Sequence, residues 1–152
     1  MHIQQKGHNV ITGLVYLSEA TTFFDELDLN CLLINAANTN QKHSITGFLY
    51  FKNGQFVQYI EGPANELDEL FLKIKSDKRH RVITVIDQIA LDDRLFPEWS
   101  MAYFASPDDS DSLGGQIFLN MTRFISDYDM TQGAKKNALI NLLGTVKQLN
   151  HS

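Results

Sequence analysis

Apolar and polar residues alternate, or gather in short apolar runs, in five segments of the first two thirds of the chain. This pattern predicts five β-strands, at residues 11–17, 45–51, 55–60, 82–89 and 99–104. The sequence Lys52-Asn53-Gly54, between the second and third of these segments, is typical of a tight turn. We therefore expect those two strands to form a β-hairpin.

Apolar residues at helical spacing predict two helices between the strands. The first covers residues 25–38, and its apolar side consists of Leu29, Leu32, Leu33 and Ala36. The second begins near Pro63, and its apolar stripe consists of Leu67, Leu70, Phe71 and Ile74. The resulting order, β-α-β-β-α-β-β, predicts a ferredoxin-like α+β fold: a five-stranded mixed sheet with both helices on one face.

The last third of the chain has a different pattern. Residues 106–115 are polar and acidic, and two amphipathic helices are predicted after them. Their apolar stripes are Ile117, Phe118, Met121, Phe124 and Ile125 in the first, and Ala138, Leu139, Leu142, Leu143, Val146 and Leu149 in the second. Stripes this apolar must cover either the free face of the sheet or a partner subunit. We therefore divide the chain into a domain at 11–105 and a C-terminal loop with a two-helix cap at 106–152.

Composition excludes several classes of protein. A net charge of −5 and a pI near 5.4 argue against a nucleic-acid-binding surface. Cys31 is the only cysteine, so an intrachain disulfide is excluded. No apolar stretch approaches the roughly 20 residues that span a bilayer, and the N-terminus has no segment of signal-peptide type, so a cytoplasmic protein without membrane contact is expected. The five histidines lack metal-ligand spacing, and no metal site is expected.

Four short segments carry the candidate chemistry: Tyr16, Asn40, Gln58 and the tripeptide Trp99-Ser100-Met101. They provide a phenol, two amides, an indole and a thioether, which suit a site that rearranges hydrogen bonds rather than one that hydrolyses a bond. By strand alternation, Gln58 shares a face with two apolar residues. A buried amide left without partners costs about 1–3 kcal/mol, so Gln58 needs a polar neighbour, and Tyr16 on an adjacent strand is a candidate.

Tyr16, Asn40 and the basic segment 78–81 each also have a structural explanation when they are taken alone. Strand tyrosines are usually core residues with a satisfied hydroxyl. Asn40 follows the predicted first helix, where asparagine is a common cap. The segment 78–81, Lys-Arg-His-Arg, is typical of a solvated, cationic helix end that complements the helix dipole.

The joint spacing favours a functional interpretation. Tyr16 lies 24 residues before Asn40, Asn40 lies 18 before Gln58, and Gln58 lies 43 before Met101. In these separations, from about residue 11 to 105, the chain resembles the BLUF family of blue-light sensors, which hold a flavin without a covalent bond. The run Phe56-Val57-Gln58-Tyr59-Ile60-Glu61-Gly62 resembles the glutamine motif of that family. A second motif is matched by Ile74, Asp77, Arg79 and His80.

The resemblance implies a bound flavin, FAD in the first place and FMN as the alternative. It implies that Leu32 and Ile74 sandwich the isoalloxazine ring, and that Arg79 and His80 lie near the ribityl and phosphate end. The full set of flavin-contacting residues expected is Tyr16, Leu32, Thr39, Asn40, Leu49, Phe56, Gln58, Ile74, Asp77, Arg79 and His80. Two positions depart from the family pattern: Ala36 stands where a serine is frequent, and Thr39 where a second Asn or a His is frequent.

The implied function is light sensing rather than catalysis. Tyr16 would give an electron and a proton to the excited flavin through Gln58, and Gln58 would be left rotated or tautomerised. Trp99 and Met101 would relay the change to the C-terminal helices and so to a downstream signalling protein, with a homo-oligomer expected. Two alternatives remain: a flavin-free protein-interaction module using those helices, and an acylphosphatase-type hydrolase, which the acidic segment Leu17–Glu26 disfavours.

Overall fold

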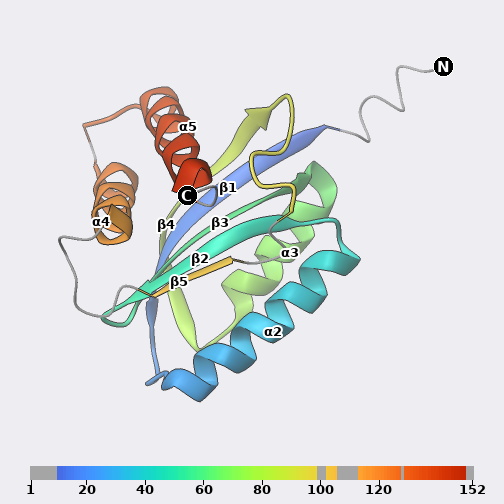
Figure 1. Cartoon of the computed structure of the whole chain (residues 1–152), viewed down its shortest axis with the longest axis vertical. Helices are drawn as coiled ribbons and strands as arrows, with labels where there is room; N and C mark the ends of the chain where they lie inside the picture. The colour runs from blue at the N-terminus through green and yellow to red at the C-terminus, as the bar shows by residue number, and fades with distance from the viewer. Residues whose placement is uncertain (1–9, 99–101, 106–112, 128, 150–152) are drawn as a thin grey trace.

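The computed structural model describes residues 10–98, 102–105, 113–127 and 129–149. Strands and helices follow one another as β1 (Ile11–Ala20), α2 (Glu26–Lys42), β2 (Thr46–Lys52), β3 (Gln55–Pro63), α3 (Ala64–Ser76), β4 (His80–Leu91), β5 (Ala102–Ala105), α4 (Leu113–Ser126) and α5 (Gln132–Leu149). The strands form one sheet in the order β4-β1-β3-β2-β5 (Figure 1). Among the described strands the β2–β5 pair is parallel and the other three pairs are antiparallel, so the predicted mixed ferredoxin-like sheet is confirmed.

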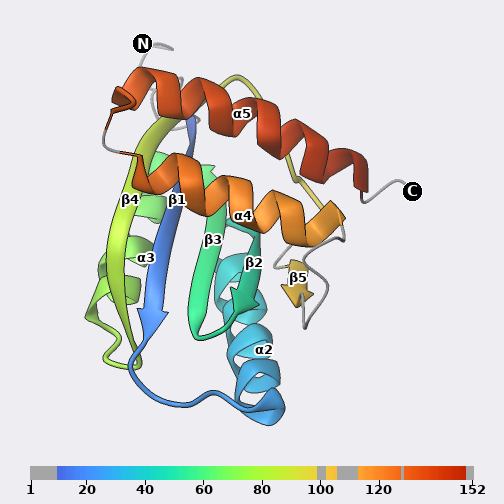
Figure 2. The same ribbon diagram turned by 90° about the vertical axis from the view of Figure 1, so that its left-hand side faces the viewer.

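Helices cover the two faces of the sheet, as Figures 1 and 2 show together. Helices α2 and α3 lie on one face, and α4 and α5 cross the other. Residues from α4 and α5 share one buried core with the strands and with Phe96, which follows β4. From the helices it contains Met121, Ile125, Leu139, Leu143 and Val146, and from the strands Val15, Leu17, Phe48, Tyr50, Val57, Tyr59, Ile86 and Ile89. The C-terminal stripes therefore cover the free face of the sheet, which is the first of the two predicted alternatives.

The register of the central strands brings the candidate residues into one row. Tyr16 on β1 lies directly opposite Gln58 on β3, and Gln58 lies opposite Leu49 on β2. Because side chains at paired positions point to the same face of a sheet, all three face α2 and α3. The opposite parity on β3, Val57 and Tyr59, faces α4 and α5.

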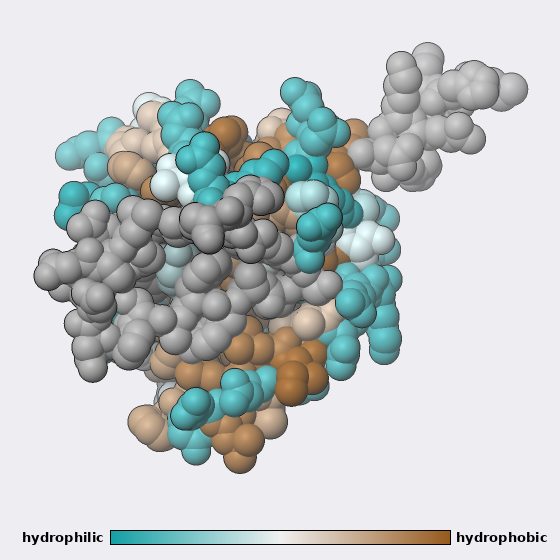
Figure 3. Space-filling model, viewed as in Figure 1, coloured by the Kyte–Doolittle hydropathy of each residue, from teal (hydrophilic) through white to brown (hydrophobic). Residues whose placement is uncertain are grey.

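Helix α2 begins at a capping box in which Asp25 and Asp28 satisfy each other's backbone N–H groups. It continues to Lys42, with His43 as the C-cap, so the interpretation of Asn40 as a cap is wrong. The predicted inner side is confirmed, since Leu29 is buried. Leu27 and Ile34, on the other side, are 69% and 61% exposed, and hydrophobic surface is visible where α2 lies in the space-filling view (Figure 3).

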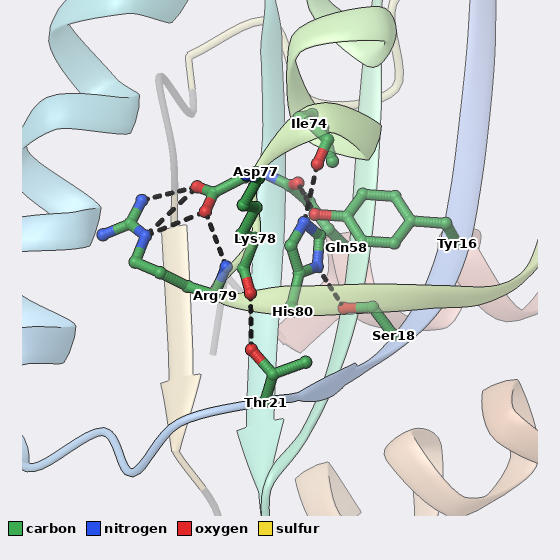
Figure 4. A network of polar contacts seen from close by, with 9 residues as sticks. All are labelled: Tyr16, Ser18, Thr21, Gln58, Ile74, Asp77, Lys78, Arg79 and His80. Atoms are coloured by element: carbon green, nitrogen blue, oxygen red, sulfur yellow. Dashed lines mark hydrogen bonds and ion pairs between the residues drawn. The ribbon is translucent and has the colours of Figure 1, made fainter.

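The basic segment after α3 is not a helix end. Helix α3 stops at Ser76, Asp77 is its C-cap, and β4 already begins at His80. The chain therefore reverses direction over Asp77, Lys78 and Arg79. This turn places the side chain of His80 beside Tyr16 and Gln58, while Arg79 lies on the far side of Asp77 (Figure 4).

Candidate functional site

A cavity of about 270 Å³ lies between the sheet and the two helices α2 and α3. Its lining consists of Tyr16, Phe24, Leu32, Asn35, Ala36, Thr39, Asn40, Leu49, Phe56, Gln58, Leu70, Lys73, Ile74, Asp77, Arg79 and His80. Every one of the eleven residues that the sequence singled out for a ligand is in this set. Trp99 and Met101 lie outside the described residues.

At the floor of the cavity, Tyr16 and Gln58 form a short hydrogen bond. The hydroxyl of Tyr16 donates to Oε1 of Gln58 at 2.5 Å, and both side chains are buried. The polar neighbour that a buried Gln58 requires is therefore Tyr16, as predicted. Because the phenol uses its only proton in this bond, the orientation of the Gln58 amide is tied to the protonation of Tyr16.

The surroundings of Tyr16 hold its ring in place and keep its hydroxyl protonated. Its ring centroid lies 5.7 Å from that of Phe71 and 6.0 Å from that of His80. Burial, and to a smaller extent the negative charge of Asp77, raises the pKa of Tyr16 well above its usual value near 10. Tyr16 is therefore a neutral hydrogen-bond donor throughout the physiological pH range.

His80 is held from two sides (Figure 4). Its Nε2 lies 2.7 Å from the carbonyl oxygen of Ile74, and its Nδ1 lies 2.7 Å from Oγ of Ser18. Since a carbonyl oxygen only accepts, Nε2 must carry a proton. In the neutral ring Nδ1 then accepts from the Ser18 hydroxyl. Both nitrogens are thus used to join β4 to α3 and β1.

Asp77 and Arg79 form a compact ion pair at the turn between α3 and β4. The Arg79 Nε lies 3.0 and 3.2 Å from the two carboxylate oxygens of Asp77, and Nη2 lies 2.6 Å from Oδ2. The hydrogen bonds from Arg79 lower the pKa of Asp77 to about 2. Both groups therefore stay charged, and their charges cancel locally.

Asn40 lies in the last turn of α2, where it is 2% exposed. Its backbone carbonyl accepts hydrogen bonds from the N–H groups of His43 and Ile45, which fixes the end of α2 against the start of β2. The side chain of Asn40 lines the cavity, and its amide offers a donor and an acceptor in one plane.

Sequence reasoning gave no ligand role to five of the lining residues: Phe24, Asn35, Ala36, Leu70 and Lys73. Leu70 and Ala36 belong to the predicted apolar sides of their helices, and this was the available signal. Phe24 precedes α2 and packs edge-to-face on Phe56, with ring centroids 5.3 Å apart. Nothing in the local sequence pattern around Phe24 indicates this contact.

The hydrogen-bond donors around the cavity are amides, hydroxyls, the imidazole of His80, the guanidinium of Arg79 and the ammonium of Lys73. Among the residues that the structure describes, no group of three or more His, Cys, Asp or Glu side chains is arranged to hold a metal ion. No described helix combines the length and apolar character needed to cross a membrane.

The model of the family described as BLUF, sensors of blue-light using FAD, matches residues 11–102. The chain belongs to the BLUF family. The match covers the whole sheet up to the start of β5, together with both helices that enclose the cavity. BLUF proteins are blue-light sensors that use a flavin, and this agrees with the resemblance of the Tyr16, Asn40 and Gln58 spacing.

Three similar proteins show how BLUF domains occur. The chain is 37% identical over 100 residues to the photoactivated adenylate cyclase subunit beta of Euglena gracilis, a match that covers 65% of this chain and 12% of the cyclase subunit. The dark-state structure of the BLUF protein BlrB has a TM-score of 0.66 at 23% identity, covering 91% of this chain and 98% of BlrB. The photo-activated state of BlsA has a TM-score of 0.62 at 28% identity, covering 88% and 94%.

The cavity of this BLUF chain fits the ring system of a flavin. Leu32 from α2 and Ile74 from α3 provide apolar walls, while Asn40 and Gln58 provide amides that can pair with the polar edge of the ring. The volume is close to the lower end of the range of about 300–1,000 Å³ typical of small-molecule sites. A planar ring with a tail that extends into solvent suits such a space.

Proposed function

We propose that this chain senses blue light through a flavin held in the cavity, and that Tyr16 and Gln58 are its photochemical pair. The observation that carries the proposal is the 2.5 Å hydrogen bond from the Tyr16 hydroxyl to Gln58 Oε1 at the cavity floor. Leu32 and Ile74 would hold the flavin ring between the helices, and Asn40 would orient it.

A bound flavin supplies the absorption of blue light and, once excited, the oxidising power. Loss of an electron makes the Tyr16 phenol strongly acidic, and its proton already lies on the bond to Gln58 Oε1. The proton would therefore move to Oε1 while Nε2 of Gln58 gives up one of its own protons to the flavin, which would also hold the electron, so that Gln58 stays neutral. When the electron and a proton return to Tyr16, Gln58 is left reversed, either rotated or as its imidic acid tautomer.

Reversal of the Gln58 amide exchanges donor and acceptor without a change of shape, because the two ends of a carboxamide are nearly equal in size. The packing of Phe56 and Leu49 around Gln58 is then preserved while the hydrogen-bond direction changes. A Gln58 donor turned toward a carbonyl of the bound flavin would lower its excitation energy, and the absorption would move to longer wavelength.

The test compares two buried tyrosines on opposite faces of the sheet. Purified wild-type chain, reconstituted with FAD, is expected to be yellow and to shift its absorption to longer wavelength under blue light, with reversal in darkness. Tyr16→Phe and Gln58→Leu are expected to bind FAD without the shift. Tyr50→Phe is the matched control, because Tyr50 is buried against the core formed with α4 and α5, and it is expected to keep the shift.

Three results would contradict the proposal: a wild-type chain that takes up no flavin, a light-induced shift that persists in Tyr16→Phe, or a shift lost equally in Tyr50→Phe. Binding is measured by flavin fluorescence quenching. The shift is measured by difference absorption spectroscopy.

We further propose that the C-terminal region, residues 106–152, passes the light signal to a partner protein and that the chain itself is not an enzyme. The similar cyclase subunits carry their BLUF match on a small share of a much longer chain. Here the structural support is strand β3, which carries Gln58 on one face and, on the other, Val57 and Tyr59, which pack in one core with residues of α4 and α5.

A further inference from the structure

Three basic side chains line the cavity, and they differ in what they already contact. Arg79 is bound through two of its nitrogens to the Asp77 carboxylate, and both ring nitrogens of His80 lie at hydrogen-bond distance from Ile74 and Ser18 (Figure 4). By contrast, Lys73 makes no ion pair or hydrogen bond with any residue that the structure describes.

The position of Lys73 places its charge at the mouth of the cavity. Lys73 comes directly before Ile74 on α3, and both residues line the cavity. Ile74 is half-buried, whereas Lys73 is exposed, as is Asn35 on the facing helix α2. The apolar walls therefore belong to the inner part of the cavity, and Lys73 and Asn35 belong to its rim.

The electrostatics of the rim favour an anion at Lys73. The Asp77–Arg79 pair contributes no net charge, because the carboxylate stays ionised beside the guanidinium. The chain as a whole carries a net charge of −5, which repels a phosphate group from most of the surface. Lys73 is thus the cavity-lining cation, among the described residues, whose charge no contacting carboxylate balances.

We propose that Lys73 recognises the phosphate of a flavin nucleotide, and that through it the chain prefers FMN and FAD to riboflavin. The inference rests on the proposed function, since it concerns the tail of the same ligand. It assigns the phosphate contact to α3 rather than to Arg79 and His80, which the family resemblance places near that end. Those two residues instead hold the turn between α3 and β4 in place.

Lys73 could also serve only to stabilise helix α3, and the experiment has to separate that role from phosphate recognition. Lys73 and Lys75 both lie in the last turn of α3, where positive charge is favourable for the helix dipole. Lys75 does not line the cavity, and its ammonium lies 5.3 Å from the ring centroid of Phe71. Lys75→Gln is therefore the matched control: it removes the same charge from the same turn without changing the rim.

The experiment titrates flavin-free protein with riboflavin, FMN and FAD and follows flavin fluorescence. Riboflavin and FMN differ only by the phosphate, so the ratio of their dissociation constants isolates this contact. At low salt we expect wild type to bind FMN about three- to tenfold more tightly than riboflavin, as for a single solvent-exposed charge-assisted contact. Lys73→Gln should bring the ratio to about one, while Lys73→Arg and Lys75→Gln should preserve it.

Salt provides a second readout that a merely structural role would not produce. At about 1 M salt the Debye length falls to about 3 Å, so the preference of wild type for FMN should shrink toward that of Lys73→Gln. Circular dichroism checks that each variant is folded, and an exposed lysine at a helix surface is not expected to affect folding.

The outcomes separate this inference from the proposed function. A wild type that binds all three flavins equally, a ratio unchanged in Lys73→Gln, or an equal loss in Lys75→Gln would each overturn the role of Lys73 while leaving flavin binding intact. A wild type that binds none of the three overturns the proposed function as well.

Discussion

Glu61 lies three residues after Gln58 on β3, and its carboxylate is completely buried on the opposite face of the sheet. It accepts four hydrogen bonds. Two come from the side chains of Tyr59 and Thr46, at 2.8 and 3.0 Å, and two from the backbone N–H groups of Leu95 and Phe96, at 2.9 and 2.7 Å. One carboxylate thus ties the segment after β4, which leads to residues 99–101, to the strand that carries Gln58.

We predict that Glu61→Gln is clearly destabilising. An amide offers one acceptor oxygen and places an NH₂ donor against groups that are themselves donors, so at least one buried donor loses its partner, at a cost of about 1–3 kcal/mol. Urea denaturation measures the loss. Glu19→Gln is the control, because the Glu19–Arg81 pair is largely exposed and its removal should change the free energy of unfolding by about 1 kcal/mol or less. Equal losses in the two variants would contradict this role of Glu61.

At the residue scale, strand alternation and family resemblance predicted which side chains share the cavity. Alternation alone places Gln58 on the same face as Phe56 and Ile60, and the structure has all three there. Alternation does not reveal which residue lies opposite Gln58, because that depends on the register between strands distant in sequence. Lys73 was missed for a different reason: a lysine beside an apolar helix stripe normally indicates only a solvated position.

At the scale of single elements, the ends of helices and strands are set by backbone geometry rather than by the hydrophobic pattern. Helix α2 was predicted to stop at residue 38, but it continues to Lys42 because the polar residues at its end are compatible with helix. It stops where Ser44, one residue beyond the C-cap His43, takes a positive φ of 58°. Strand β4 likewise extends beyond its β-branched run at both ends, since His80 and Leu91 pair with β1.

Two glycine-to-alanine substitutions are expected to change the stability of the protein in opposite directions. Gly144 lies within α5, and a Cβ there would meet no atom within 4 Å, so Gly144→Ala should stabilise the protein by about 0.5–1 kcal/mol. Gly47 lies in β2, where a Cβ would come within 2.0 Å of the backbone oxygen of Tyr59. Gly47→Ala must therefore displace β2 from β3, and a loss of several kcal/mol is expected, on the order of the largest single-residue effects.

Thermal or urea unfolding of the two glycine variants measures both changes against wild type. A neutral Gly47→Ala would show that β2 and β3 are not packed as closely as their register indicates. A destabilising Gly144→Ala would mean that α5 has contacts at Gly144 that the structure does not contain.

At the scale of the whole molecule, the two faces of the sheet have different roles. One face, with α2 and α3, encloses the cavity. The other packs against α4 and α5 in an apolar core. The layer order was predictable because the C-terminal stripes are too apolar to remain in water and the predicted sheet offered one uncovered face. The crossing of α4 and α5 over that face was not, since a stripe specifies what is buried but not the angle at which it lies.

The different roles of the two faces lead to a prediction about how the light signal reaches α4 and α5. We expect a change at Gln58 to reach α4 and α5 through β3, because Val57 and Tyr59 of this strand belong to the core that α4 and α5 share. Hydrogen exchange compared in light and darkness should therefore differ within residues 119–127 and 132–149, and less at the turn between β2 and β3. Exchange that is identical in both states across those helices would place the output elsewhere. The Gln58→Leu variant is the control and should show no light-dependent difference.

Tyr16 and Gln58 are 42 residues apart in sequence, and they meet only after β1 has paired with β3. A slip of one residue in that pairing would turn Tyr16 to the wrong face of the sheet. Pairing between such distant segments is slow compared with helix formation or collapse, because the entropy cost of closing a long loop comes before any stabilising contact forms. A newly synthesised or refolding chain therefore becomes responsive to light late, and the return of the light-induced shift during refolding should follow strand registration rather than compaction.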